Sequence, residues 1–171
     1  VKWKNMRTNW SSGFFPFFVL LINFGFTLWV MSMRPEWFST IYGIWFLVQQ
    51  GLVAMAITAI IIGTQAKKEP FRRVVTEDLT RDIGNLMLTM TLLWAYFSFS
   101  QYLIIWSGNM PETASYWYER RQGGFENLGT ILIMFGFFVP FLLLLSPRMK
   151  RDPKNLATIG IVILVIRFLD V

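Results

Sequence analysis

The chain has 171 residues, and none of them is cysteine or histidine. Without cysteine the chain can form neither a disulfide nor a thiolate-ligated zinc or iron–sulfur site. Without histidine it has no bis-imidazole haem ligation, no imidazole metal site and no Ser-His or Cys-His nucleophile pair. We therefore expect a chain without a redox centre of its own, and we name no catalytic, cofactor-binding or metal-binding residue in it.

Charge is also scarce, because only 15% of the residues are charged while 54% are hydrophobic. An average soluble domain is about 25% charged. The composition excludes a soluble globular domain, a disordered chain, a fibre and a disulfide-rich secreted scaffold, and it favours a multi-pass membrane protein. The net charge is +6, and we expect the basic residues to meet lipid headgroups or protein partners rather than nucleic acid.

Long apolar stretches define the architecture. A helix needs about 20 apolar residues to cross the hydrocarbon core, and lipid forces such segments to be helical because it offers no water to the backbone. The sequence predicts an all-α integral membrane protein, a single domain over residues 1–171, with about five transmembrane helices in an antiparallel up-down bundle. The expected spans are 13–33, 38–63, 83–106, 128–145 and 156–171. Since the chain begins with Val and ends inside an apolar run, we expect it to be part of a larger helical subunit.

The basic residues are unevenly divided between the two sides of this bundle. The N-terminal segment, loop 64–82 and loop 146–155 carry three, five and four Lys or Arg residues. The opposite side carries only Arg34, Arg120 and Arg121 outside the spans. The positive-inside rule then places the N-terminal end and the two basic loops in the cytoplasm.

Some local features are also predicted. Thr76 has the character of an N-cap, and a short surface helix is expected to precede membrane entry near Asp82. Residues 34–37 are few enough to make a tight hairpin between the first two spans. Pro16 and Pro140 can kink their helices and free backbone carbonyls.

Two charged residues fall inside the fifth span. A lone charge at the bilayer centre costs about 2.5–3.5 kcal/mol on insertion scales. Arg167 and Asp170 are spaced i, i+3, so they share a helix face and can pair. Two interpretations stay open: a functional carboxylate, as proton relay or quinol-site group, or a structural ion pair that holds the fifth helix against the bundle.

The third span carries a polar stripe, Thr91, Trp94, Ser98 and Gln101, spaced three, four and three residues apart. In lipid such a stripe turns inward, where it either bonds neighbouring helices or lines a proton path or ligand cavity. Our candidates for a proton path are therefore Asp170, Arg167, Gln101 and Ser98.

Amides also lie within the first two spans. Asn23, Gln49 and Gln50 are interpreted as residues that hold helices together. Because Gln49 and Gln50 point about 100° apart on a helix, at most one should reach a given partner.

Residues 94–112 read WAYFSFSQYLIIWSGNMPE, and Trp117-Tyr118 and Arg120-Arg121 follow closely. This stretch resembles the F subunit of bacterial alternative complex III, a quinol:electron-acceptor oxidoreductase, whose membrane subunits are similar to that of polysulfide reductase. The resemblance runs from about Phe71 to the end and includes the terminal residues Arg167 to Asp170.

The resemblance implies a membrane subunit of a respiratory complex in the bacterial cytoplasmic membrane. It would scaffold the membrane sector among lipids and other subunits, including multihaem cytochrome and iron–sulfur subunits that hold the haem and iron–sulfur clusters. Quinone contact and proton translocation are further expectations. The alternatives are a fragment of a secondary transporter, although no internal repeat is found, and a purely structural membrane subunit.

Overall fold

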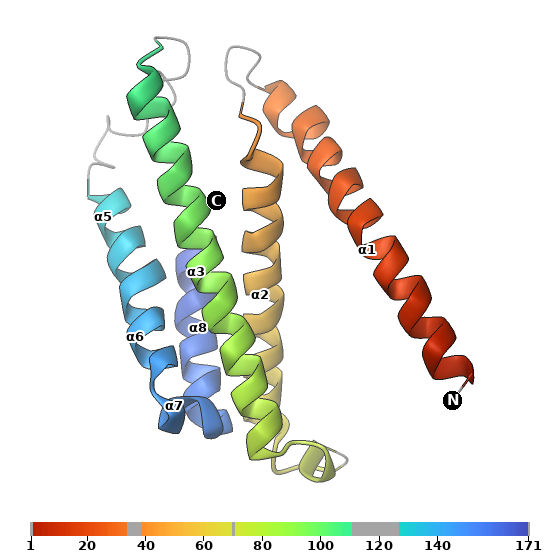
Figure 1. The fold of residues 1–171 in the computed structure, drawn as a ribbon. Helices are drawn as coiled ribbons and strands as arrows, with labels where there is room; N and C mark the ends of the chain where they lie inside the picture. The colour runs from red at the N-terminus through yellow and green to blue at the C-terminus, as the bar shows by residue number, and fades with distance from the viewer. Residues whose placement is uncertain (1, 34–38, 70, 111–126, 171) are drawn as a thin grey trace.

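A computed structural model describes residues 2–33, 39–69, 71–110 and 127–170 of the chain. Helices dominate these ranges, and no strand occurs within them (Figure 1). The elements are α1 (Lys2–Trp29), η1 (Met31–Met33), α2 (Tyr42–Gln65), η2 (Phe71–Arg73), α3 (Glu77–Gly108), α5 (Leu128–Ile133), η3 (Met134–Phe138), α6 (Val139–Leu145), α7 (Pro147–Arg151) and α8 (Pro153–Asp170). The all-α expectation is confirmed for the part of the chain described.

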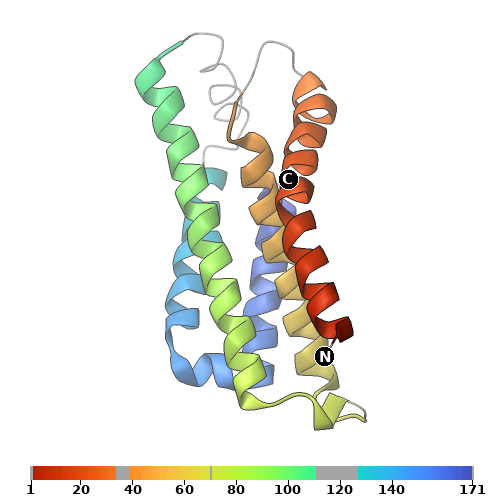
Figure 2. The same ribbon diagram turned by 45° about the vertical axis from the view of Figure 1, so that its right-hand side comes forward.

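The long helices run alternately up and down (Figures 1 and 2). The start of α1, the segment η2 and the short helix α7 lie at one end of the bundle, which we call the basic end. The other end, where α1 and α3 finish and α2 and α5 begin, is called the distal end. The segments that the charge count assigned to one side therefore do lie together.

Four stretches are long and apolar enough to cross a membrane: Asn5–Met33, Tyr42–Gln65, Glu77–Gly108 and Leu128–Leu145. The fifth expected span corresponds to α8, which has 18 residues. It carries Lys154, Arg167 and Asp170, and these charges lower its apolar character. Helix α8 nonetheless lies among the others and packs most closely against α2.

Several helix boundaries differ from those predicted. Helix α1 already begins at Lys2, and the polar residues before Gly13 continue it. Helix α3 runs unbroken from Glu77, so the separate surface helix expected before Asp82 does not form. The N-cap is confirmed, because the Leu79 N–H donates to Thr76 Oγ1 at 3.2 Å. The hairpin at 34–37 lies outside the described residues.

The fourth span is not one regular α-helix. Residues Met134–Phe138 form a π-helical turn between α5 and α6, in which the Val139 N–H donates to the Met134 carbonyl. Pro140 follows directly and is buried. Since proline has no N–H, the Gly136 carbonyl lacks the donor that residue 140 would supply in an α-helix. Pro16, in contrast, lies within a continuous α1.

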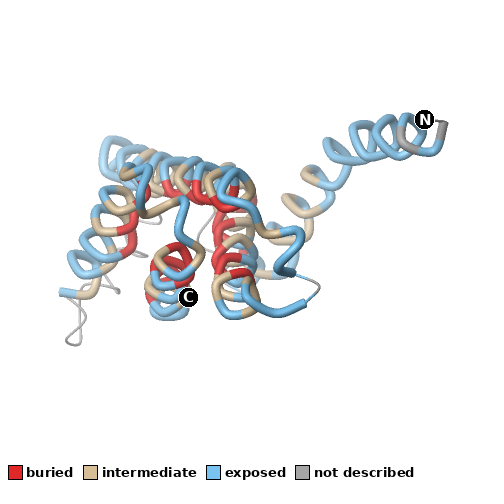
Figure 3. Tube along the Cα trace, turned by 90° about the horizontal axis from the view of Figure 1, so that it is seen from below, coloured by how far each residue is buried: buried red, intermediate tan, exposed pale blue. Residues whose placement is uncertain are grey.

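The core fills the space between α2, α3, α6 and α8, and Figure 3 shows the buried residues on the facing sides of these helices. Close approach of α2 and α8 depends on small residues. A Cβ atom on Gly160 would lie 2.8 Å from the Ala56 carbonyl oxygen, and one on Gly63 would lie 2.6 Å from the Pro153 carbonyl oxygen. The fully buried or nearly buried members of the core are Leu52, Ala56, Ala59, Ile62, Ile83, Met87, Leu144, Leu156, Ile159 and Ile163.

Helix α1 stands apart from this core. It meets α2 near the distal end, where Asn23 lies against Gly43 and the rings of Phe26 and Phe46 are 4.1 Å apart between centroids. Towards the basic end it diverges from the other helices (Figures 1 and 3). Its aromatic side chains are largely exposed, as an element surrounded by lipid would be.

We expect the substitution Gly160→Ala to destabilise the bundle by about 1–3 kcal/mol, because the added methyl group would press against the α2 backbone. Gly129→Ala is the matched control, since a Cβ atom at that helical position meets nothing within 4 Å. Unfolding of the two purified variants in detergent, followed by tryptophan fluorescence, would measure the difference. Equal stability of the two variants would contradict the packing described for α2 and α8.

Candidate functional site

The ion pair expected in the fifth span is present on α8. Arg167 Nη1 lies 3.0 Å from Asp170 Oδ2, and the two side chains are only 2% and 9% exposed. The i, i+3 spacing places both groups on one face of the helix. Arg167 follows the start of α8 by 14 residues, which is about 21 Å along the helix axis. The pair is therefore well inside the bundle rather than at its basic end.

Two further elements surround the Arg167 guanidinium. Its Cζ atom lies 3.6 Å from the centroid of the Trp94 ring of α3, a cation–π contact. Nη2 donates to the Gly136 carbonyl in η3 at 3.4 Å. A Cβ atom at position 136 would collide with Nη2. The glycine leaves space for the guanidinium, and Pro140 leaves the Gly136 carbonyl without its α-helical donor.

Helix α2 contributes to the site through Gln49, whose Nε2 donates to Asp170 Oδ2 at 3.3 Å. Gln49 is buried, whereas Gln50 is exposed. The expectation that only one of the two amides reaches a given partner is therefore confirmed. Gln49 was interpreted as a residue that holds helices together rather than as part of a site, and its contact with the carboxylate adds it to the candidate site.

Some polar atoms of this cluster have no hydrogen-bond partner among the described residues. They are Gln49 Oε1, Trp94 Nε1 and Arg167 Nε, and all three are buried. One is an acceptor and two are donors. An unsatisfied buried polar group costs about 1–3 kcal/mol. A hydrogen bond from these atoms to a further polar group would remove that cost.

The polar stripe of α3 turns inward, as predicted. Trp45 Nε1 of α2 donates to Ser98 Oγ at 2.8 Å, and Ser39 Oγ donates to Gln101 Oε1 at 2.6 Å. Thr91 is buried and bonds the carbonyl of Met87 in its own helix. Ser98 and Gln101 thus bond to residues before or within α2, nearer the distal end than Arg167 and Asp170.

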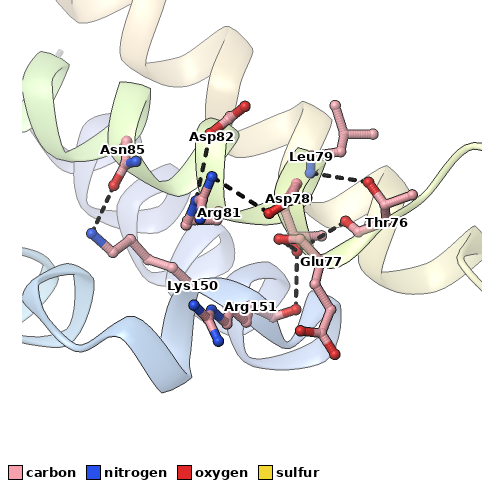
Figure 4. A network of polar contacts seen from close by, with 10 residues as sticks. Thr76, Glu77, Asp78, Leu79, Arg81, Asp82, Asn85, Lys150 and Arg151 are labelled. Carbon is pink, nitrogen blue, oxygen red and sulfur yellow. Dashed lines mark hydrogen bonds and ion pairs between the residues drawn. The ribbon is translucent and has the colours of Figure 1, made fainter.

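A second polar cluster lies at the basic end, where α7 meets α3 (Figure 4). Lys150 Nζ donates to Asn85 Oδ1 at 2.7 Å, and Thr80 Oγ1 donates to the Arg151 carbonyl at 2.9 Å. Gly84 leaves space for the Lys150 stem. The first contact is exposed and the second is partly buried, and both hold α7 against α3. We assign this cluster a structural role.

The structure also bears on where a cofactor or a larger ligand could bind. The described residues contain no group of three His, Cys, Asp or Glu side chains that could hold a metal ion. Two hollows of about 550 and 520 Å³ lie along the first half of α1, and Arg7 lines both. These hollows are remote from α8, so they are not part of the ion-pair cluster.

A double-mutant cycle would test whether Arg167 and Asp170 depend on each other. Arg167→Met alone leaves a buried carboxylate without its cation, and we expect it to cost about 3–5 kcal/mol of stability. The double variant Arg167→Met with Asp170→Leu should recover a large part of that loss, because neither charge remains buried. Unfolding of the purified single variants and of the double variant would give the stability that each one loses. If the double variant loses the sum of the two single losses, the groups are independent.

No family model matches this chain, and no curated protein matches it. The candidate site is the buried ion pair of α8, with which α2, α3 and η3 each make one contact.

Proposed function

We propose that this chain is an integral-membrane subunit of a respiratory quinol:electron-acceptor oxidoreductase complex of the alternative complex III type, in the bacterial cytoplasmic membrane. The pattern of residues 94–112 supports the class of complex. The observation that carries the proposal is the buried Arg167–Asp170 pair, which is connected to the three neighbouring elements. In this proposal the chain scaffolds the membrane sector and moves protons through Asp170.

The burial of the pair supports a proton role. Apolar residues of similar volume often replace a buried ion pair without loss of stability, and sometimes with a gain. Ionisable side chains within membrane segments mark ion pathways and proton relays. Asp170 is the group of the pair that can take up and release a proton, and Arg167 and Gln49 bond its ionised form.

Electron transfer is assigned to other subunits. The chain has no His and no Cys, so its side chains lack the usual ligands of haem and iron–sulfur centres. In the proposed assembly, multihaem cytochrome and iron–sulfur subunits hold these groups. A quinol bound to such a complex would supply electrons and protons as it is oxidised to the quinone, and Gln49 and Asp170 have the polar groups to bond its headgroup.

The surface agrees with a position among lipids and other membrane subunits. Large apolar side chains are exposed along α1, α3, η3 and α8. The positive-inside rule puts the basic end in the cytoplasm, so the distal end faces the periplasm. Lipid headgroups then meet the basic residues at the cytoplasmic side.

Purification from native membranes would test membership of the complex. A tagged chain extracted in a mild detergent should migrate with multihaem and iron–sulfur subunits and carry their haem absorbance. Migration of the chain alone, with uptake of a solute into liposomes, would instead support the secondary-transporter alternative and contradict our proposal.

The substitution Asp170→Asn would test the proton role within the assembled complex. We expect it to abolish quinol-driven proton movement while leaving assembly intact, because an amide cannot accept and release the proton of a carboxylic acid. The control is Asp152→Asn, an exposed carboxylate that accepts a hydrogen bond from the Lys154 N–H at the basic end. Unchanged proton movement in the Asp170→Asn complex would leave the chain a purely structural subunit.

A further inference from the structure

A row of polar contacts leads from the distal end to Asp170. We define the polar row by three hydrogen-bonded pairs: Ser39 with Gln101 at 2.6 Å, Trp45 with Ser98 at 2.8 Å, and Gln49 with Asp170 at 3.3 Å. On α3 the row continues to Trp94, whose carbonyl accepts a hydrogen bond from Ser98 Oγ at 2.7 Å. From Gln101 to Trp94 the rise is about 10 Å at 1.5 Å per residue.

Among the described residues, the half of the bundle towards the basic end has no such row. Between the level of the pair and the basic end, the buried side chains of α2 and α8 are apolar, and on α3 they are apolar between Thr91 and Thr80. We call this segment the apolar plug; its members include Leu52, Ala56, Ala59, Met87, Ile159 and Ile163. From Leu52 to Ile62 it extends about 15 Å along α2.

We infer that Asp170 exchanges protons with one side of the membrane only, the side of the distal end. This inference rests on the proposed function and adds the side of the membrane from which protons reach Asp170. A buried water needs two to four polar partners, and apolar cavities stay dry. The polar row and the unpartnered atoms of Gln49, Trp94 and Arg167 supply such partners on the distal side, whereas the plug supplies none. The step is a proton passing between water and the Asp170 carboxylate, and no electron moves with it.

The charges near Asp170 agree with this direction. Arg167 is its cationic partner at 3.0 Å. Four charged side chains of the basic end, Asp78, Arg81, Asp82 and Lys150, pair or bond at their own end of α3. The apolar plug separates them from the pair. With the basic end in the cytoplasm, the exchange is periplasmic.

A purely structural polar row would be dry, whereas a row that carries protons to Asp170 would contain water. Single cysteine substitutions can distinguish a dry row from a hydrated one. The 171 residues contain no Cys, so each substitution introduces a unique thiol into this part of the complex. A thiol reacts as the thiolate, which forms in water and not in hydrocarbon. The probe is a small, charged, membrane-impermeant methanethiosulfonate, applied to intact cells stripped of their outer membrane and separately to inverted membrane vesicles.

The test variant is Ser98→Cys. Its neighbour Phe99→Cys is the matched control at the same depth, because Phe99 is 60% exposed on the outer face of α3. Ile159→Cys, at 1% exposure, reports on the plug. We expect Ser98→Cys to react at least about tenfold faster than either control, and only when the reagent is added from the distal side. If Ser98→Cys does not assemble, Gln101→Cys on the same stripe takes its place.

Reaction from the basic side, or no reaction of Ser98→Cys or Gln101→Cys above the Phe99→Cys level, would overturn the inference. Because labelling measures water access and not turnover, its result is independent of the tests of the complex. Loss of proton movement in Asp170→Asn with an unlabelled row would keep the proposed function and remove the direction. If the polar row is labelled from the distal side but the chain migrates alone, the direction of water access holds and the proposed function fails.

Discussion

A guanidinium group enclosed by apolar helices must be compensated on several sides at once. Water molecules supply hydrogen bonds to an exposed guanidinium, but inside a bundle each partner must come from a defined element. Here α8 supplies the Asp170 carboxylate, α3 the Trp94 ring, and η3 the Gly136 carbonyl, while α2 reaches the carboxylate through Gln49. Apolar packing, as between Gly160 and the Ala56 carbonyl, fixes helix positions by shape. The directional contacts of Arg167 also fix the relative position of these elements at one depth.

Much of the helical architecture follows from elementary rules. Lipid-length apolar runs predicted the helices, and the i, i+3 spacing predicted the ion pair. What the rules missed depends on tertiary contacts. The π turn at Met134–Phe138 places the Gly136 carbonyl against a side chain 31 residues further along the chain. Helix α3 begins at Glu77 because Thr76 caps it and nothing between Glu77 and Asp82 breaks it.

The candidate site was predicted in part for a similar reason. The stripe of Trp94, Ser98 and Gln101 is a periodic feature and could be recognised in the sequence. Gln49 and Gln50 could not be told apart, because their difference depends on how α2 is rotated. That rotation is set where Gly160 meets the Ala56 carbonyl, so it requires knowledge of α8. A glycine such as Gly136 carries no signal by itself, because the group that needs its space lies on another helix.

The central place of α8 bears on the order of biogenesis. Domains form from the N-terminus as the ribosome advances, yet α8 follows every other described helix in the sequence and packs into the middle of the bundle against α2. During translation the earlier helices must enter the bilayer without their principal neighbour. The insertion machinery, or surrounding lipid, has to shelter Gln49 and Trp94 until Arg167 and Asp170 emerge. The contacts of the Arg167–Asp170 pair with α2 and α3 are then among the last to form as the bundle assembles.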